Sequence, residues 1–326
     1  MRRLVLSVYL ACIVCLFCLA HLPAHAQPYP NRPIQLVVPA VPGATSDITG
    51  RILAEEMEKL LGTKVIVLNK PGASMTLGTD TVVRSKKDGY TLLYAPSAAT
   101  VYARIVNPES VSYDPDKDLE PLGLHCYFPL VIAVQKEAPW KTFSELVEHA
   151  KKNPGQIRIS TAGMGSLANF DIAIIESLTG AQFTLVPFKG GESVVTALLG
   201  GHVEATCDML SKFVPHVESG ALRILIISKK MAEYSQLPTI TDFGYKQDLL
   251  SGWFSLYAPA GIPEEARKVL VPAIEKAIKN PEIKSKVERM QYIVDYKSPG
   301  ELKRIMAEEY GVASDIAVRI GLRKQK

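Results

Sequence analysis

Short apolar runs alternate along the chain with longer stretches in which apolar positions recur every three or four residues. The run Ile34–Val38 predicts a strand, and Ser46–Leu61 predicts a helix whose apolar residues share one face. Gly62 ends that helix, and Val65–Leu68 and Thr91–Tyr94 predict two further strands. This order of strands and helices favours a parallel sheet with helices on both faces.

The same alternation restarts near residue 130 and predicts a second α/β unit. Its expected strands are Leu130–Val134, Ile157–Ser160, Phe183–Val186, Glu204–Cys207 and Leu222–Ile227. Its expected helices lie near Phe143–Lys152, Leu167–Thr179, Glu192–Leu199 and Ser211–Ser219. A last strand follows at Trp253–Tyr257, and the chain from Glu264 is predicted to be helical, with interruptions at Pro281 and Ser298–Gly300. We therefore expect two domains with a cleft between them, made of residues 27–128 plus 252–326 and of residues 129–251.

The first 26 residues have the pattern of a secretory signal peptide. Arg2 and Arg3 give a cationic start, and the 17 residues from Leu4 to Ala20 carry no charge. Ala24-His25-Ala26 then fits the small-x-small cleavage pattern. We predict cleavage after Ala26 and export of the mature chain, with an uncleaved membrane anchor as the alternative.

Composition narrows the class of protein. The chain has 326 residues, of which 47% are hydrophobic and 21% charged, which excludes a disordered or collagen-like polymer. The formal charge of +4 comes with no basic face, so no nucleic-acid partner is expected. Only Cys126 and Cys207 remain after the leader. An exported protein can form a disulfide between them, but we favour two free, buried thiols.

The loop after the first strand is a candidate binding site. It consists of small residues and leads directly into a helix, so its backbone N–H groups and the positive helix end favour an anion. We select Ala40, Val41, Gly43 and Thr45 as candidate ligand contacts, and Asp47 as a residue that holds the loop or receives a ligand donor. A plain turn capped by Thr45 or Ser46 is the alternative.

A second strand-to-helix loop contains Gly163, Gly165 and Ser166. Gly163-x-Gly165-x-x-Ala168 formally matches a dinucleotide-binding motif, which would suit a secreted nucleotide-dependent enzyme. The next strand, however, ends in Val186–Lys189 and lacks the acidic residue that binds a ribose. We therefore favour a carboxylate site formed by N–H groups and the Ser166 hydroxyl.

Three more candidates follow predicted strands, where ligands of open α/β sheets bind. These are Ser97, Asp208 and Lys189, the last of which would supply a cation. We predict no metal, no cofactor and no enzymatic activity, because no histidine pair has metal-ligand spacing and no G-x-S-x-G, P-loop or H-E-x-x-H motif occurs. The four histidines of the mature chain are expected at the surface or as helix caps: His125, His149, His202 and His216.

A series of short motifs along the chain, taken in order, resembles a known protein family. In chain order they are Tyr29–Ile34, Pro42-Gly43, Asp47, Arg51, Asn69–Ala73, Asp88–Leu93, Tyr113–Pro115, Gly165-Ser166, Val186–Gly190, Leu199–Gly201, Asp208, Pro215–Val217 and Ala258–Gly261. With these motifs the chain resembles the Bug family, the extracytoplasmic solute-binding receptors of tripartite tricarboxylate transporters. The likeness runs from about Tyr29 to the last helix.

The resemblance implies a type II periplasmic binding protein fold, in which two α/β domains joined by two crossovers close on a ligand. It implies a small carboxylate as the ligand, membrane permease subunits as the partner and the periplasm as the location, and we expect a monomer. The two strand-to-helix loops would be the family's two pincers. A receptor for signalling rather than transport is an alternative. We expect the crossovers near Tyr127–Leu130 and Leu250–Trp253.

The chain departs from the family at the pincers. Pro39-Ala40 and Gly43-Ala44 stand where many members have Pro-Phe and a pair of glycines. Ser74 and Met75 replace usual glycines, and Asn169, a candidate ligand contact, replaces a frequent histidine. These changes alter the pocket wall, so the ligand cannot be taken from any relative.

Overall fold

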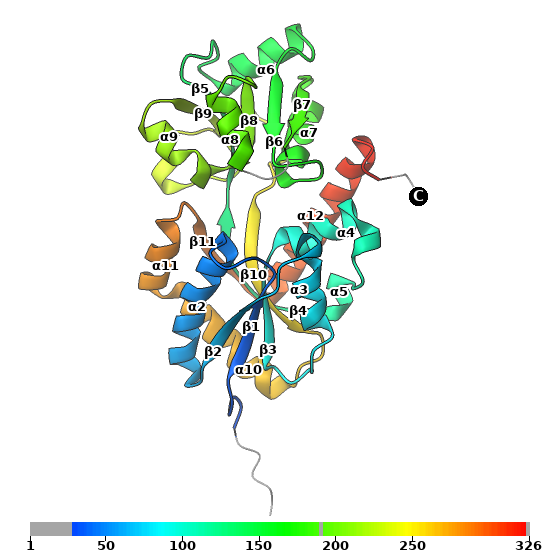
Figure 1. Cartoon of the computed structure of the whole chain (residues 1–326), viewed down its shortest axis with the longest axis vertical. Coiled ribbons are helices and arrows are strands. Elements are labelled where there is room, and N and C mark those ends of the chain that lie inside the picture. Colours follow the sequence, from blue (N-terminus) through cyan, green and yellow to red (C-terminus); the bar gives the residue numbers. More distant parts are fainter. Residues whose placement is uncertain (1–27, 189–191, 324–326) are drawn as a thin grey trace, which may run out of the picture.

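The computed structural model describes residues 28–188 and 192–323, which form two α/β lobes stacked along the long axis (Figure 1). The predicted signal peptide with its cleavage site after Ala26, and Lys189, lie outside the described residues. Two extended segments, one from β4 into β5 and one entering β10, run between the lobes (Figure 1). The fold is that of a two-domain periplasmic binding protein, as the sequence predicts.

The first lobe is built on a six-stranded sheet with the order β11-β4-β10-β3-β1-β2. Its strands are β1 (Ile34–Val38), β2 (Val65–Asn69), β3 (Thr91–Pro96), β4 (Leu119–Phe128), β10 (Gly252–Pro259) and β11 (Ile293–Lys297). β1 is parallel to β2 and β3, as predicted. The sheet as a whole is mixed rather than parallel, because β4 leaves the lobe and β10 re-enters it beside β3 and β4 in the opposite direction.

Helices cover both faces of this sheet (Figure 1). The longest are α2 (Thr45–Leu61), α10 (Glu264–Lys279) and α12 (Pro299–Arg319), and shorter ones are α3 (Thr76–Val83), α4 (Ala103–Val106), α5 (Pro115–Asp118) and α11 (Pro281–Glu288). Short turns occur at η1 (Ala73–Met75), η2 (Ala98–Tyr102) and η3 (Pro108–Ser110). α2 buries Leu53 and Met57 and ends at Gly62, whose φ of 63° suits glycine.

The second lobe has a five-stranded sheet with the order β7-β6-β8-β5-β9. Its strands are β5 (Leu130–Gln135), β6 (Arg158–Thr161), β7 (Thr184–Pro187), β8 (Ala205–Met209) and β9 (Leu222–Ile227). Its helices are α6 (Phe143–Lys152), α7 (Leu167–Thr179), α8 (Glu192–Leu199) and α9 (Val214–Glu218), with turns η4 (Leu210–Lys212), η5 (Ala232–Tyr234) and η6 (Ile240–Phe243). The single helix expected at Ser211–Ser219 is therefore divided between η4 and α9.

Two strands were not expected from the sequence pattern. β4 contains Pro121 and Gly123, which interrupt the apolar run, and its pairing with β10 shifts register twice. β11 lies in the stretch that we expected to be helical, and it pairs antiparallel with β4 at the sheet edge. Sheet pairing decides both elements, and it involves residues far apart in the chain.

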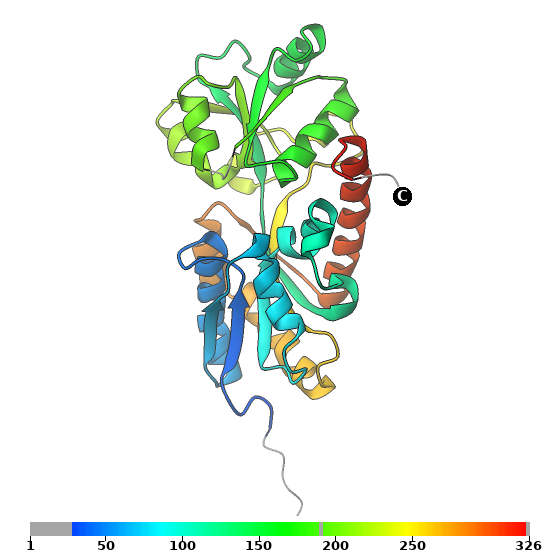
Figure 2. The ribbon, with the colours of Figure 1, turned by 45° about the vertical axis from the view of Figure 1, so that its right-hand side comes forward.

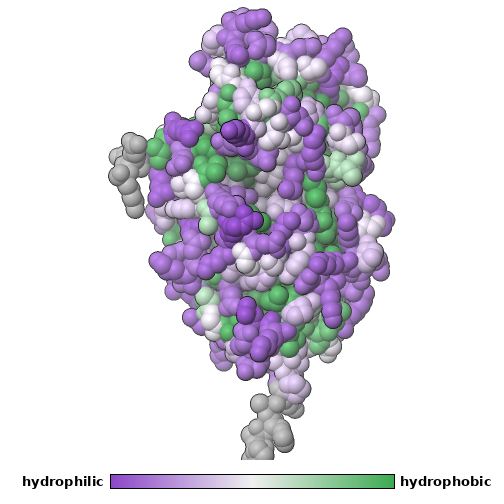
Figure 3. Space-filling view, turned by 180° about the vertical axis from the view of Figure 1, so that it is seen from behind, coloured by the Kyte–Doolittle hydropathy of each residue, from purple (hydrophilic) through white to green (hydrophobic). Residues whose placement is uncertain are grey.

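The lobes also touch beside the crossovers. α12 belongs to the first lobe but runs along the side of the molecule to α7 (Figure 2). Arg319 Nη1 donates to Ser177 Oγ at 3.1 Å, and the rings of Tyr102 and Phe170 lie 5.6 Å apart. Seen from behind, hydrophobic residues gather around the junction of the lobes, whereas most of the remaining surface is hydrophilic (Figure 3).

Burial corrects one expectation and confirms another. His125 is fully buried in β4 rather than at the surface, and its Nδ1 lies 2.8 Å from the Tyr94 hydroxyl. Burial lowers the His125 pKa to about 3, so the ring is neutral. Cys126 and Cys207 are free, buried thiols, as we favoured.

Within residues 28–188 and 192–323, no helix has the length and apolar character that a membrane span requires.

Candidate functional site

A cavity of about 390 Å³ lies between the lobes and is called the cleft cavity here. Both lobes and both crossovers line it, through Ala40, Ala44, Thr45, Ser46, Met75, Pro96, Ala98, Tyr102, Phe128, Leu130, Ala162, Gly165, Ser166, Leu167, Ala168, Asp208, Met209 and Phe254. The start of α2 faces the cavity from the first lobe, and the start of α7 faces it from the second. Two positive helix ends therefore meet at one cavity.

Asp47 fixes the loop before α2 from behind. The residue is only 3% exposed, and its Oδ2 accepts the Gly43 N–H at 2.8 Å. Its Oδ1 accepts from Asn69 Nδ2 at 2.9 Å and forms an ion pair with Arg51 at 2.9 Å. Asn69 Nδ2 also lies within 3.0 Å of the Ala40 carbonyl oxygen, which ties the loop to β2. Asp47 therefore holds the loop, which is one of the two roles that the sequence left open.

The Asp47 contacts keep its carboxylate charged. Burial alone would raise the Asp47 pKa, but the hydrogen bonds from Arg51, Gly43 and Asn69 outweigh it and lower the pKa below its usual range. Asp47 and its partners therefore form a charged brace behind the loop, outside the lining of the cleft cavity.

The first turn of α2 has no side-chain cap. Ala44 occupies the N-cap position, which differs from the Thr45 or Ser46 cap considered from the sequence. The first N–H groups of an α-helix have no partner within the helix, and here no side chain of the described residues caps them. Ala44, Thr45 and Ser46 all line the cleft cavity, so this helix start offers donors to an anion there.

The loop before α7 is also held by a side chain in the first turn of the helix that follows it. Ser166 is the N-cap of α7, and its Oγ accepts the Asn169 N–H at 3.3 Å. Asn169 Oδ1 in turn accepts the Gly165 N–H at 3.1 Å. Gly163 and Gly165 have φ values of 138° and 74°, which favour glycine. A Cβ on Gly165 would lie 2.5 Å from Val106 Cγ1, so this loop approaches the first lobe closely.

The candidates chosen from the sequence separate into groups. Ala40, Thr45, Gly165, Ser166 and Asp208 line the cleft cavity. Gly163 lines a neighbouring recess of about 380 Å³ that shares Gly165 and Ser166. Asp47 and Asn169 are buried behind their loops, and Val41 and Gly43 are exposed and outside the lining of the cleft cavity. Ser97 is fully buried outside the lining of the cleft cavity, and its Oγ has no partner among the described residues.

The sequence analysis did not identify the lysine beside the cleft cavity or the aromatic residues that form its apolar walls. Lys212 Nζ lies 2.8 Å from Asp208 Oδ2, which is an i,i+4 ion pair at the edge of the cavity. Phe128 and Phe254, one on each crossover strand, have ring centroids 5.0 Å apart. The i,i+4 spacing of Asp208 and Lys212 was visible in the sequence, whereas no local pattern shows that two distant strands place Phe128 and Phe254 side by side.

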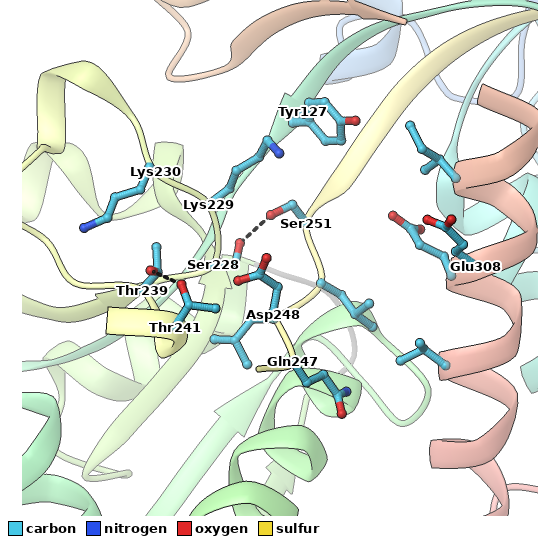
Figure 4. A pocket seen from close by; sticks show the side chains of 15 residues that line it. Tyr127, Ser228, Lys229, Lys230, Thr239, Thr241, Gln247, Asp248, Ser251 and Glu308 are labelled. Carbon is cyan, nitrogen blue, oxygen red and sulfur yellow. Dashed lines mark hydrogen bonds between the residues drawn. The ribbon is translucent and has the colours of Figure 1, made fainter. Parts of the chain in front are cut away.

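A larger cavity of about 610 Å³ lies behind the crossovers and is called the back cavity here (Figure 4). Tyr127 lines it whereas Phe128 lines the cleft cavity, because successive side chains of a strand point to opposite faces. Ser228 and Ser251 share a hydrogen bond of 2.7 Å, and Lys229 Nζ lies 4.2 Å from the Tyr127 ring centre. None of the residues that line it belongs to the first turn of a helix of eight or more residues, so we select the cleft cavity.

A buried carboxyl group connects the two cavities. Glu309 of α12 lines the back cavity, and its Oε2 accepts from the hydroxyl of Tyr102, which lines the cleft cavity, at 3.0 Å. Its Oε1 accepts from Trp253 Nε1 at 2.9 Å. Burial raises the Glu309 pKa to about 7, although Trp253, Tyr102 and the charge of Lys229 lower it.

Comparison with known proteins gives consistent matches. The model of the tripartite tricarboxylate transporter family receptor matches residues 49–322. Protein BugT of Bordetella pertussis is 32% identical over 260 residues, which cover 79% of this chain and 80% of BugT. A TctC solute binding protein from Polaromonas has a TM-score of 0.79 at 27% identity, covering 89% of this chain and 99% of that one.

Two further solved structures contain a bound acid. A Rhodopseudomonas palustris protein with adipate has a TM-score of 0.75 at 26% identity, covering 90% of this chain and 98% of that one. MatC from the same organism, with bound malate, has a TM-score of 0.70 at 26% identity, covering 88% and 99%.

Proposed function

Because the chain belongs to the tripartite tricarboxylate transporter receptor family, we propose that it captures a small carboxylate in the cleft cavity and delivers it to a membrane permease of that transporter class. The observation that carries this proposal is the meeting of two helix starts, α2 and α7, at one cavity. Backbone N–H groups and positive helix ends stabilise a carboxylate that is withdrawn from water. The adipate and malate in two similar proteins support the same ligand class.

The donors in this proposal are the N–H groups at the start of α2 and α7, together with the hydroxyls of Thr45 and Ser166 and ordered water. Gly43 and Gly165 direct their own N–H groups backwards, to Asp47 and Asn169. These glycines therefore shape the pincers, and the first-turn N–H groups hold the carboxylate. Lys212 adds a cation beside Asp208 at the cavity edge.

Closure is proposed to rotate the lobes about the segments Tyr127–Leu130 and Leu250–Trp253, which are the crossovers predicted from the sequence. A few residues in such segments can absorb the whole motion. Small-angle scattering should show a smaller radius of gyration with saturating ligand, and an unchanged radius would count against a hinge.

The receptor is proposed to work as an exported monomer in the periplasm after cleavage of the signal peptide behind Ala26. Mass spectrometry of the exported protein would test that cleavage.

A thermal-shift screen against a carboxylate library tests the function. A ligand at a hundred times its Kd stabilises the folded state by roughly 2.7 kcal/mol, which raises Tm by several degrees. The matched control is the uncharged amide of each acid, which should give no shift. A protein that responds to no carboxylate, or equally to acid and amide, would overturn the proposal. Recovery of the ligand unchanged after incubation would separate a receptor from an enzyme.

A further inference from the structure

This inference rests on the proposed function and narrows it. We infer that the cleft cavity selects carboxylates whose body is a plain hydrocarbon, aliphatic or aromatic, over acids whose body carries hydroxyl groups. Most of the residues that line the cavity are apolar, and the large ones are Met75, Tyr102, Phe128, Leu130, Met209 and Phe254.

The few polar groups of the lining are already engaged or lie at the helix starts. Asp208 is the one charged side chain among the described residues of the lining, and each of its oxygens already has a partner. Its Oδ2 pairs with Lys212, and its Oδ1 accepts the Met209 N–H at 2.7 Å. The hydroxyls of Thr45, Ser46 and Ser166 lie where the carboxylate is expected. The body of the ligand therefore meets few free hydrogen-bonding partners.

The apolar floor of the cavity is rigidly built. The Phe128 ring lies directly on Gly252, where a Cβ would come within 1.7 Å of it. The Phe128 ring also meets Phe254 at 5.0 Å and the edge of Tyr292 at 6.3 Å between ring centres. These contacts fix the ring before any ligand arrives. The floor is therefore preformed, which favours a complementary apolar body.

One apolar wall is maintained against backbone strain. Ala73, Ser74 and Met75 have successive φ values of 46°, 52° and 75°, in the left-handed region that L-residues rarely adopt. Glycine would adopt this turn without strain, yet Met75 occupies its last position and lines the cleft cavity. Strain of this kind persists where the surroundings enforce it, often at ligand sites. We infer that the strained turn is retained because it places the Met75 side chain in the wall of the cleft cavity.

A hydroxyl on the ligand body would lose its hydrogen bonds to water on entering this cavity and gain few in return. An apolar site discriminates against an added hydroxyl by up to about a hundredfold. Calorimetry with two matched pairs, in which the added hydroxyl lies far from the carboxylate, tests this: hexanoate against 6-hydroxyhexanoate, and phenylacetate against 4-hydroxyphenylacetate, with the wider library compared in the same way. The hydrocarbon member should bind roughly ten- to a hundredfold more tightly.

The outcomes separate the two proposals. If no carboxylate of the library binds, the proposed function itself is wrong. If carboxylates bind but the hydroxylated acids bind as tightly as their hydrocarbon partners or more tightly, the function stands and this inference is overturned.

A variant pair tests the role of Met75. Met75→Gly removes an apolar wall and relieves the strain, so Tm should stay equal or rise while the affinity for the hydrocarbon acid falls roughly tenfold. Ala73→Gly relieves strain in the same turn outside the lining of the cavity, so it should raise Tm and leave affinity unchanged. A Met75→Gly protein with normal affinity and unchanged discrimination would contradict the inference.

Discussion

Asn169 Oδ1 accepts the backbone N–H of Gly165, four residues earlier, at 3.1 Å. The other lobe repeats this arrangement, because Asp47 Oδ2 accepts the N–H of Gly43 at 2.8 Å. In each lobe a buried side chain in the first turn of a helix reaches back to hold the loop before it. The two loops that enclose the cleft cavity are therefore positioned by the same device, although one brace is charged and the other neutral.

Removing the charged brace should loosen the first loop. Asp47→Ala loses the acceptor for Gly43 and Asn69, so we expect roughly tenfold weaker carboxylate binding and a lower free energy of unfolding. Calorimetry and thermal melts measure the two effects. Arg51→Ala is the matched control, since it removes the ion pair of a half-exposed arginine and its hydrogen bond to Asn69 Oδ1 but leaves the Asp47 acceptors in place, so it should change both values less. Equal losses in the two variants would show that the ion pair, not the loop brace, matters.

The charged carboxylate of Asp47 is also expected to make the stability of the protein sensitive to acid. The Asp47 pKa is lowered in the folded state, so its stabilisation is complete above the unfolded value of 3.8. It is lost as the pH falls below that value towards the folded pKa. Denaturant titrations from pH 6 to pH 3 should show that Asp47→Asn loses stability less steeply than the parent below about pH 4. Parallel curves would argue against this contribution.

Ser166 has two roles that one pair of variants can separate. Ser166→Ala removes the cap of α7, which costs about 1 kcal/mol of stability, and also a hydroxyl from the cleft cavity, which weakens binding. Ser298→Ala removes the cap of α12 far from the cavity and should lower Tm comparably without changing affinity. If Ser166→Ala alters only stability, its hydroxyl does not contact the ligand.

Gly165 and Val106 predict a steric coupling between the lobes. Gly165→Ala introduces a Cβ against Val106 and a strained φ of 74°, so it should destabilise the protein and hinder closure. Gly43→Ala is the control, because its φ of 82° carries similar strain but its Cβ would meet nothing within 4 Å. Thermal melts should therefore show a larger loss for Gly165→Ala.

A second substitution isolates the clash. A Val106→Ala background removes the two closest contacts and leaves only the Val106 Cβ at 3.2 Å, so Gly165→Ala should cost less there and approach the cost of Gly43→Ala in the parent, roughly 1–2 kcal/mol. If the cost of Gly165→Ala stays as large in that background, the clash with Val106 is not the cause.

The buried carboxyl group of Glu309 is expected to make the folded protein less stable as the pH rises towards neutral. Its pKa of about 7 in the folded protein lies above the ordinary value of 4.5, so the unfolded chain loses this proton first as the pH rises. Stability should therefore fall between about pH 4.5 and 7, by up to about 1.4 kcal/mol per pH unit. Glu309→Gln should flatten this slope in denaturant titrations.

The flattening should be partial. Asp171 is also buried, its pKa is raised by that burial and in part by the charge of Glu309, and it acts with the same sign. A Glu309→Gln protein with the parent's slope would show that Glu309 is not the group that titrates.

Elements set by local pattern could be predicted from the sequence. α6 and α7 have their predicted bounds because the apolar periodicity lies within each segment and the stops, Asn153 and Gly180, follow it directly. The loops before α2 and α7 were recognised as candidate pincers for the same reason, since the small residues and the following helix are adjacent in the chain.

Features set by distant pairing could not be predicted. β11 forms because β4 offers an edge more than a hundred and sixty residues earlier, and the sequence around Ile293 does not contain that information. Likewise, the aromatic floor depends on Phe128 and Phe254 meeting from two crossover strands. His125 was misplaced because its polarity favoured the surface, whereas its strand is covered on both faces.

The two free thiols make the stability of each lobe separately measurable. Cys126 lies in β4 of the first lobe and Cys207 in β8 of the second, and burial raises the pKa of both thiols. Neither can react with an alkylating reagent until its own sheet opens. The alkylation rates of the two cysteine-containing peptides, followed by mass spectrometry in one sample, therefore report how often each lobe opens.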